Sequence, residues 1–200
     1  QELIMKIQSS MDLLREEDWN DADNNIYPKK LLFDEPWLRY LSQYPKIWLD
    51  MPNTWDRRRK QKYDDLPKSI DKDKYPKYYL RNFHHQTDGY LSDFSASIYD
   101  LQVEILFNGS ADAMRRRIIK PLKNGLNNFN SKKKSSIKIL DVATGSGRTL
   151  KQLRGAFPKE KITGLDLSDA YLKEASRYIS DLKGDLIELV KGNAEELPFE

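Results

Sequence analysis

The residues best suited to chemistry stand between positions 138 and 147, where an apolar run ends in an acid and leads into a loop of small residues. The acid is Asp141, and the small residues are Ala143, Gly145 and Gly147. Small residues allow a sharp turn and a close approach of a ligand to the backbone. The free N–H groups of a helix beginning near Arg148 would add partial positive charge. We therefore expect a buried strand, a tight turn and a helix, with a nucleotide-type ligand at the end of the strand.

The spacing of the glycines argues against a dinucleotide. The fingerprint G-x-G-x-x-G requires a third glycine where this chain has Leu150. A carboxylate directly before the loop would also repel a pyrophosphate, whereas it suits a ligand with a positive amino group. A dehydrogenase is therefore the least favoured interpretation. S-adenosylmethionine, which carries an amino group and a sulfonium, fits the acid better.

The segment resembles the first motif of class I S-adenosylmethionine-dependent methyltransferases, acid-x-Gly-x-Gly-x-Gly. Ala143 stands at the first glycine, as in the quinone-methylating branch of that family. The resemblance implies that this segment binds S-adenosylmethionine as cofactor. The residues that it assigns to cofactor binding here are Asp141, Ala143, Thr144, Gly145 and Gly147.

Two further segments continue the same pattern. A short strand over 161–166 is predicted to end in Asp166, which lies 19 residues after Gly147 and could accept hydrogen bonds from ribose hydroxyls. A third strand, predicted from Leu186 to Val190, leads into a loop that resembles the adenine-contacting loop of the family. The resemblance adds Leu167, Asn193 and Ala194 to the cofactor-binding residues.

The fold predicted from these elements is α/β, with a doubly wound, Rossmann-like sheet. We expect its first three strands in this chain, preceded by a mainly helical N-terminal region. The expected divisions are an irregular and helical extension over 1–77, a helical cap over 78–130 and the first half of the cofactor-binding domain over 131–200. Because the chain stops soon after the third strand, we expect it to be a fragment that is inactive alone.

Helix signals in the N-terminal part are less regular. Prolines predict a break in the helical pieces at Pro36 and Pro45, and residues 64–77 have the composition of a surface linker. Ser92 is a good N-cap for a helix with Ile98 and Leu101 on its inner face. A further helix from Ser110 or Asp112, with Met114 and Ile118 on one face, is predicted to end at Pro121, and the lysines at 132–134 are predicted to lie in a loop.

The composition excludes several classes of protein. The 200 residues include no cysteine, so disulfides, zinc clusters and thiol nucleophiles are ruled out, and we expect no metal site. No apolar run reaches the roughly 20 residues of a membrane span. The expected location is the cytoplasm, or the plastid stroma for a plant protein, because the block 82–117 is similar to the extension of cyanobacterial and plastid methyltransferases.

His84 and His85 are the only histidines. Methyl transfer from a sulfonium depends mainly on positioning, although an oxygen or nitrogen acceptor can require a base. These residues are weak candidates for that base, and Asp88 and Tyr90 are weaker. The alternative is a histidine pair that holds a polar turn beside Gly89, so the catalytic residue stays open.

Three functions remain in competition. The first is methyl transfer from S-adenosylmethionine to a small or lipophilic acceptor. The second is RNA methylation through the basic runs 57–59 and 115–117. A simpler interpretation of these runs is that they are solvated helix faces, and the acids interspersed among them argue against a nucleic-acid partner. The third is a non-catalytic module that binds partners through the tryptophans and tyrosines of residues 33–55.

Overall fold

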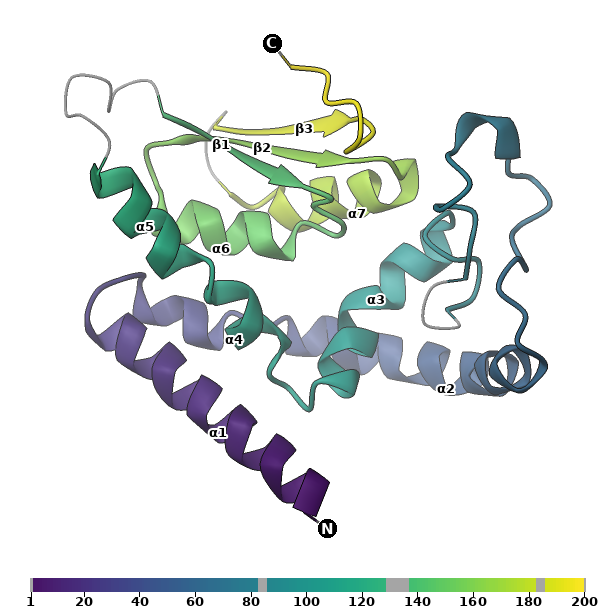
Figure 1. Cartoon of the computed structure of the whole chain (residues 1–200), viewed down its shortest axis with the longest axis horizontal. Coiled ribbons are helices and arrows are strands. Elements are labelled where there is room, and N and C mark those ends of the chain that lie inside the picture. The colour runs from purple at the N-terminus through teal and green to yellow at the C-terminus, as the bar shows by residue number, and fades with distance from the viewer. Residues whose placement is uncertain (1, 83–85, 129–136, 183–185, 200) are drawn as a thin grey trace.

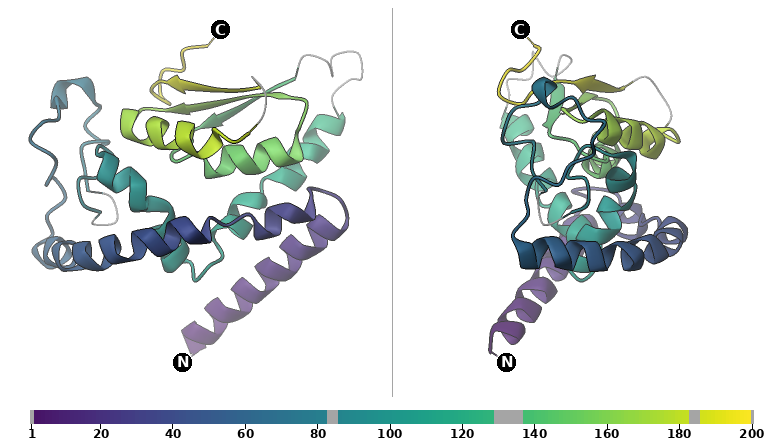
Figure 2. Two further views of the ribbon diagram at one scale, coloured as in Figure 1. Left: turned by 180° about the vertical axis from the view of Figure 1, so that it is seen from behind. Right: turned by 90° about the vertical axis from the view of Figure 1, so that its right-hand side faces the viewer.

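The computed structural model describes residues 2–82, 86–128, 137–182 and 186–199. It has three layers, seen from three sides in Figures 1 and 2. A small sheet forms the first layer, two helices cover one face of the sheet, and the N-terminal helices lie beyond those two. The α/β fold with a helical N-terminal region is therefore as predicted.

The sheet consists of β1 (Lys138–Val142), β2 (Lys161–Asp166) and β3 (Ile187–Lys191). All pairs are parallel and the order is β1-β2-β3, with Asp141 opposite Gly164 and Asp166 opposite Lys191. The crossovers are α6 (Arg148–Ala156) and α7 (Asp169–Ile179), which lie on the same face of the sheet (Figure 1). The predicted strand–helix alternation is confirmed, with the third strand shifted by one residue.

The main core lies between this sheet face and the helices. It contains Leu150, Leu153 and Phe157, which were predicted to share one face of a helix, together with Ile139 and Ile162. The expectation that the first strand is buried is wrong for much of β1, because Leu140 and Val142 are 39% and 42% exposed. Among the described residues, β1 pairs only with β2, and no helix covers the second face of the sheet.

The N-terminal region is far more helical than the sequence predicted. It holds α1 (Glu2–Asp23), a short 3₁₀ helix η1 (Lys29–Phe33) and α2 (Trp37–Lys60). The predicted break at Pro45 is wrong, because α2 runs without interruption through both Pro45 and Pro52. The two prolines are seven residues apart and exposed, so the carbonyl groups that lose their helical partners lie on one solvent-facing side.

The chain then crosses a largely exposed segment with one 3₁₀ turn, η2 (Lys72–Lys74), before α3 (Asp93–Leu106), α4 (Ala111–Arg116) and α5 (Ile119–Asn128). Ser92 caps α3 as predicted, and its hydroxyl accepts from the Ser95 N–H. Pro121 does not end a helix, since it lies in the first turn of α5, where no helical N–H is required. Met114 and Ile118 were predicted to share one face of a single helix, but α4 ends at Arg116, and the two residues are 42% and 45% exposed. The lysines at 132–134 lie outside the described residues.

A buried ion pair fastens α1 to the rest of the region. The guanidinium of Arg116 donates to both carboxylate oxygens of Asp18, at 2.9 and 2.6 Å, and to the Leu31 carbonyl oxygen at 2.8 Å. The Tyr27 hydroxyl also donates to Asp18, at 2.6 Å, and burial together with this carboxylate raises the pKa of Tyr27. Each group therefore has a partner although water is excluded.

Replacing Asp18 with alanine should lower the free energy of unfolding by about 3–5 kcal/mol, because it leaves the Arg116 charge buried without its carboxylate. Chemical denaturation measures the loss. Asp12→Ala, on the exposed side of the same helix, is the matched control and should change stability by less than about 0.5 kcal/mol. Equal losses in the two variants would mean that the Asp18 pair adds nothing beyond an ordinary surface charge.

Candidate functional site

The site is formed where β1 and β2 end side by side. Asp141 lies near the carboxyl end of β1 and Asp166 is the last residue of β2, so the parallel register brings the two predicted acids to one edge of the sheet. The loop between β1 and α6 lies beside them, since the Thr144 N–H donates to the Leu165 carbonyl at 2.9 Å. The structure thus brings together the acids and the small-residue loop that the sequence singled out.

The loop has the backbone that small residues allow. Ala143, Gly145 and Gly147 all have left-handed φ angles, of 59°, 57° and 82°. A Cβ on Gly147 would also lie 3.0 Å from the Cβ of Ala175, whereas one on Gly145 would meet only Tyr171, at 3.8 Å. Glycine at 147 is therefore required by both conformation and packing, and alanine at 143 holds a conformation that L-residues rarely adopt.

Asp141 has no cationic partner among the described residues. The Thr144 hydroxyl donates to it at 2.6 Å, and this is its one hydrogen bond to the side chains described. Burial raises the pKa of Asp141, the Thr144 hydrogen bond opposes that effect, and the charge of Asp166 adds to it. A carboxylate in this state favours a positively charged ligand, because a cation would offset both the burial and the neighbouring charge.

Asp166 is largely occupied by the chain itself. It accepts from the Gly145 N–H at 2.8 Å, from the Ser168 N–H at 2.9 Å and, more weakly, from the Tyr79 hydroxyl at 3.4 Å. A carboxylate offers about four acceptor positions, so little capacity remains for ribose hydroxyls unless Tyr79 withdraws. The same acid therefore braces the glycine loop and faces the space above it.

Asn193 also faces a tyrosine. The Tyr78 hydroxyl donates to its side-chain oxygen at 3.1 Å, and the neighbouring residues Leu167 and Ala194 are half-buried and exposed respectively. Both acceptors that the family resemblance assigns to the nucleoside thus contact the segment 75–79, where the predicted linker 64–77 meets the predicted cap 78–130. Three tyrosines within five residues of a polar segment were the available signal for this contact.

Tyr78 and Tyr79 belong to a larger tyrosine cluster, defined here by ring contacts at centroid distances of 5.5–6.3 Å. Its members come from the segment 75–79, the start and middle of the α3 region, and α7. Burial raises the pKa of Tyr79, Tyr90 and Tyr171, which keeps their hydroxyls neutral and able to donate. The cluster consists of Tyr75, Tyr78, Tyr79, Tyr90, Tyr99 and Tyr171.

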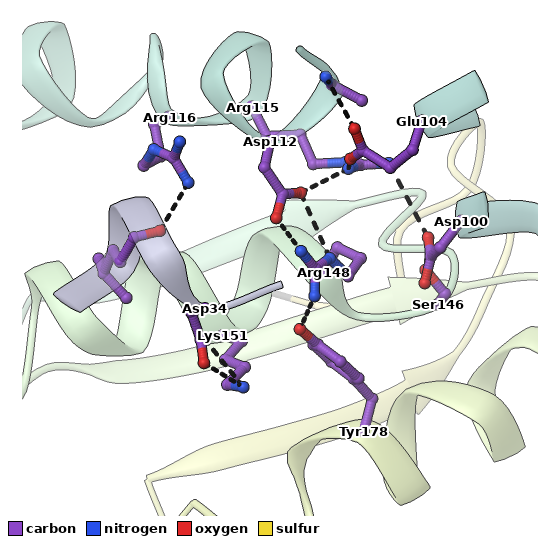
Figure 3. A network of polar contacts seen from close by, with 12 residues as sticks. Asp34, Asp100, Glu104, Asp112, Arg115, Arg116, Ser146, Arg148, Lys151 and Tyr178 are labelled. Carbon is purple, nitrogen blue, oxygen red and sulfur yellow. Dashed lines mark hydrogen bonds and ion pairs between the residues drawn. The ribbon is translucent and has the colours of Figure 1, made fainter. Parts of the chain in front are cut away.

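A charged network holds the loop from its other side (Figure 3). The Ser146 hydroxyl donates to Asp100 of α3 at 2.6 Å. The guanidinium of Arg148, only 3% exposed, binds Asp112 of α4 and donates to the Tyr178 hydroxyl of α7. The helices α3 and α4 therefore fix both the loop and the first residue of α6.

The basic runs are solvated helix faces only in part, since Arg58, Arg59 and Arg117 are exposed and the other three arginines are not. Arg57 and Arg116 are 7% and 4% exposed and are ion-paired with Asp50 and Asp18, so they are not solvated helix faces. Arg115 binds Asp112 at 2.6 Å and Glu104 at 3.3 Å. These cations already have protein carboxylates as partners and are not free to bind phosphate.

The residues that the sequence offered as a catalytic base do not form a recognisable catalytic group in the described part of the chain. His84 and His85 lie outside the described residues. Asp88 is in a left-handed turn, with φ of 61°, and Tyr90 is part of the tyrosine cluster. Within the described ranges, no helix is long and apolar enough to cross a bilayer.

Comparison with known proteins agrees with this geometry. Residues 139–200 match the model of a family described as methyltransferase domain. Over 109 residues the chain is 32% identical to the demethylmenaquinone methyltransferase of Thermotoga maritima, a match that covers 54% of this chain and 42% of the relative. The enzyme of the same name from Bacillus cereus is 38% identical over 68 residues, which cover 34% of this chain and 29% of the relative.

Among solved structures, the YcgJ protein of Bacillus subtilis matches with 21% identity and a TM-score of 0.29, over 38% of this chain and 33% of that one. This likeness is too small to carry an argument. The chain spans less than half the length of the curated relatives it matches.

Asp141→Asn should raise the free energy of unfolding at pH 7, by about 0.5–2 kcal/mol, because it removes a charge that the fold disfavours. Since the folded pKa of Asp141 is raised, the folded state binds the proton more tightly than the unfolded chain. The wild type therefore gains stability relative to the variant as the pH falls towards the ordinary aspartate pKa of about 3.9.

Denaturant unfolding of both proteins at several pH values measures this difference. Asp169→Asn, an exposed acid at the start of α7, is the control and should leave stability nearly unchanged. A variant less stable than the wild type at pH 7 would show that the Asp141 charge is already compensated. The match to the methyltransferase family model covers residues 139–200, the part of the chain that contains both acids.

Proposed function

We propose that this chain binds S-adenosylmethionine and that the protein transfers its methyl group to a small or lipophilic acceptor. The observation that carries the proposal is the pair of acids at the ends of β1 and β2, beside a left-handed glycine loop. One acid has no cationic partner in the described part of the chain, and the other has its carboxylate directed at the loop that a nucleoside would cover. The match of residues 139–200 to methyltransferase domains supports the same assignment.

The residues present fit this cofactor in chemical type. Asp141 would pair with its ammonium group, Asp166 with the ribose hydroxyls, and Asn193 and Ala194 with the adenine, while Leu167 would contribute apolar contact. The loop residues Ala143, Thr144, Gly145 and Gly147 would let the backbone approach the ligand. When bound, S-adenosylmethionine supplies an activated methyl group on a sulfonium.

The rest of the chain would position and shield that group. We propose that residues 78–130 act as a cap over the cofactor segment 131–200, because α3 both contacts α7 and holds Ser146 through Asp100. Residues 1–77 are then an extension that leads into the tyrosines at the start of the cap, Tyr78 and Tyr79. His84 and His85 stay candidates for a base.

A lipophilic quinol is the acceptor class with most support, because the similar proteins of Thermotoga maritima and Bacillus cereus are demethylmenaquinone methyltransferases. RNA draws less support. Three of the six arginines on which that alternative rested are bound to Asp18, Asp50 and Asp112.

Calorimetric titration with S-adenosylhomocysteine tests cofactor binding. Asp166→Ala should abolish measurable binding, because about two charge-assisted hydrogen bonds to the ribose are lost. Asp169→Ala removes an exposed acid only three residues away and should bind like the wild type. Circular dichroism of both variants confirms that they are folded. Binding that survives in Asp166→Ala would exclude this acid from the site.

Methyl transfer requires a second assay, with labelled S-adenosylmethionine, quinol, phenol and amine acceptors, and the longer natural chain where one exists. Incorporation into a quinol supports the full proposal. Cofactor binding without transfer to any of these acceptors would leave a cofactor-binding module and refute the enzyme assignment.

Tyr79→Phe should tighten binding of S-adenosylhomocysteine by about threefold, because it removes a hydroxyl that occupies Asp166 in the free protein. The same calorimetric titration gives the dissociation constant. Tyr75→Phe, in the ring stacked on Tyr79, is the control and should have no effect. Weaker binding by Tyr79→Phe would mean that the hydroxyl contacts the ligand rather than competing with it.

A further inference from the structure

Helix α2 presents a stripe of large side chains to solvent. The stripe consists of Trp37, Leu41, Tyr44, Trp48 and Trp55, which are 62%, 68%, 44%, 61% and 58% exposed. Their spacings of 4, 3, 4 and 7 residues place them within about 60° of arc on a helix of 3.6 residues per turn. Three of the four tryptophans of the chain therefore lie in one line.

This stripe is not the face that holds α2 to the protein. Tyr40 and Ile47, on another side of the helix, pack against Ile98 and Leu101 of α3 in a separate small core. In both Figures 1 and 2, α2 runs along the side of the molecule away from the sheet. Burial of the stripe would therefore leave the fold and the candidate site undisturbed.

The charge of α2 indicates what could cover the stripe. The helix has six basic and two acidic residues, whereas α1 has two basic and seven acidic ones. The last turn of α2 ends in Arg57, Arg58, Arg59 and Lys60. Arg57 is buried beside Asp50, and the other three are exposed, with Asp56 paired to both Arg59 and Lys60. A positive cluster thus continues the aromatic stripe at one end.

We propose that α2 docks on the surface of an anionic lipid membrane. Tryptophan and tyrosine rings prefer the boundary between headgroups and acyl chains, and clustered Lys and Arg are attracted by anionic lipids. A helix with both features lies in the plane of the membrane with its aromatic stripe inserted. No membrane-spanning helix is needed for this contact.

A cavity beside the stripe gives this contact a use. It has a volume of about 650 Å³ and lies between α2 and α3, with Thr54 and Arg58 of α2 and Tyr99 of α3 among its lining residues. Tyr99 contacts Tyr171 in the tyrosine cluster, at a centroid distance of 5.5 Å. A lipophilic acceptor leaving the membrane could enter here and approach the candidate site; this step alone rests on the proposed function.

Vesicle binding tests the proposal with the intact chain. Phosphatidylcholine vesicles with and without phosphatidylglycerol are the probes, and co-sedimentation together with the tryptophan emission maximum is the readout. Wild-type protein should bind the anionic vesicles with blue-shifted emission and should bind them more weakly as salt is raised. Trp48→Ser/Trp55→Ser should lower the partition coefficient at least about tenfold.

Matched variants separate the two contributions. Trp19→Ser, which removes the exposed tryptophan of α1, should bind like the wild type. Arg58→Gln/Arg59→Gln should weaken binding to anionic vesicles by about tenfold or more and leave the weak binding to neutral vesicles unchanged. S-adenosylhomocysteine titration of the same variants should match the wild type, so failure here is independent of the cofactor assignment.

Two results would overturn the proposal. One is the absence of binding to anionic vesicles at low salt, or binding that is the same in the wild type and Trp48→Ser/Trp55→Ser. The other is a dimer in sedimentation velocity that this double variant dissociates while no vesicle binding occurs, since a second copy would then be the occupant of the stripe.

Discussion

The arrangement of the molecule depends on one buried cation, Arg148. It follows the glycine loop directly, and its guanidinium joins three elements that are distant in sequence: α4 through Asp112, α7 through Tyr178, and α6, to which it belongs (Figure 3). Burial by itself would lower the pKa of Arg148, but the surrounding acids and tyrosines outweigh that effect and raise it. A permanent charge enclosed in this way fixes geometry more strictly than apolar packing, because each displacement would leave a buried charge without a partner.

The glycine loop consequently lies between two sets of acids with different roles. Asp100 and Asp112, on the side of the helical region, are balanced by Ser146, Arg115 and Arg148 and hold the loop in place. Asp141, on the opposite side, is balanced by no cation that the structure describes, and burial raises its pKa. A buried carboxylate without a compensating cation reduces the stability of the fold. Such a group is typical of a site where a bound ligand supplies the missing charge. The distribution of charge within a few residues thus separates the groups that build the loop from those that face a ligand.

Local signals account for the parts of the fold that the sequence predicted well. The strands, the Ser92 and Ser168 caps and the apolar side of α6 all follow from residue type and spacing within about ten positions. The continuous α2 could not be predicted in this way, because its prolines are tolerated only where the freed carbonyl groups face solvent, which is a tertiary property. The tyrosines over Asp166 and Asn193 were missed for a related reason: their partners lie 87 and 115 residues further along the chain. The same is true of Arg116, whose neighbour Asp18 lies 98 residues away.

The tyrosines and the tryptophans of this chain lie in two different environments. The tyrosines gather around the candidate site, where the hydroxyls of Tyr79 and Tyr78 donate to Asp166 and Asn193. The buried Tyr171 hydroxyl lies 3.4 Å from the Ser95 hydroxyl. Three tryptophans instead line the outside of α2, where rings exposed by about 60% lower the solubility of the chain unless a non-aqueous surface covers them. Folding alone gives no reason to keep them there, since Tyr40 and Ile47 already secure the helix. An apolar stripe with exposed cations at its end, on a helix that also lines a cavity with Tyr99, is explained by a surface that is both apolar and anionic.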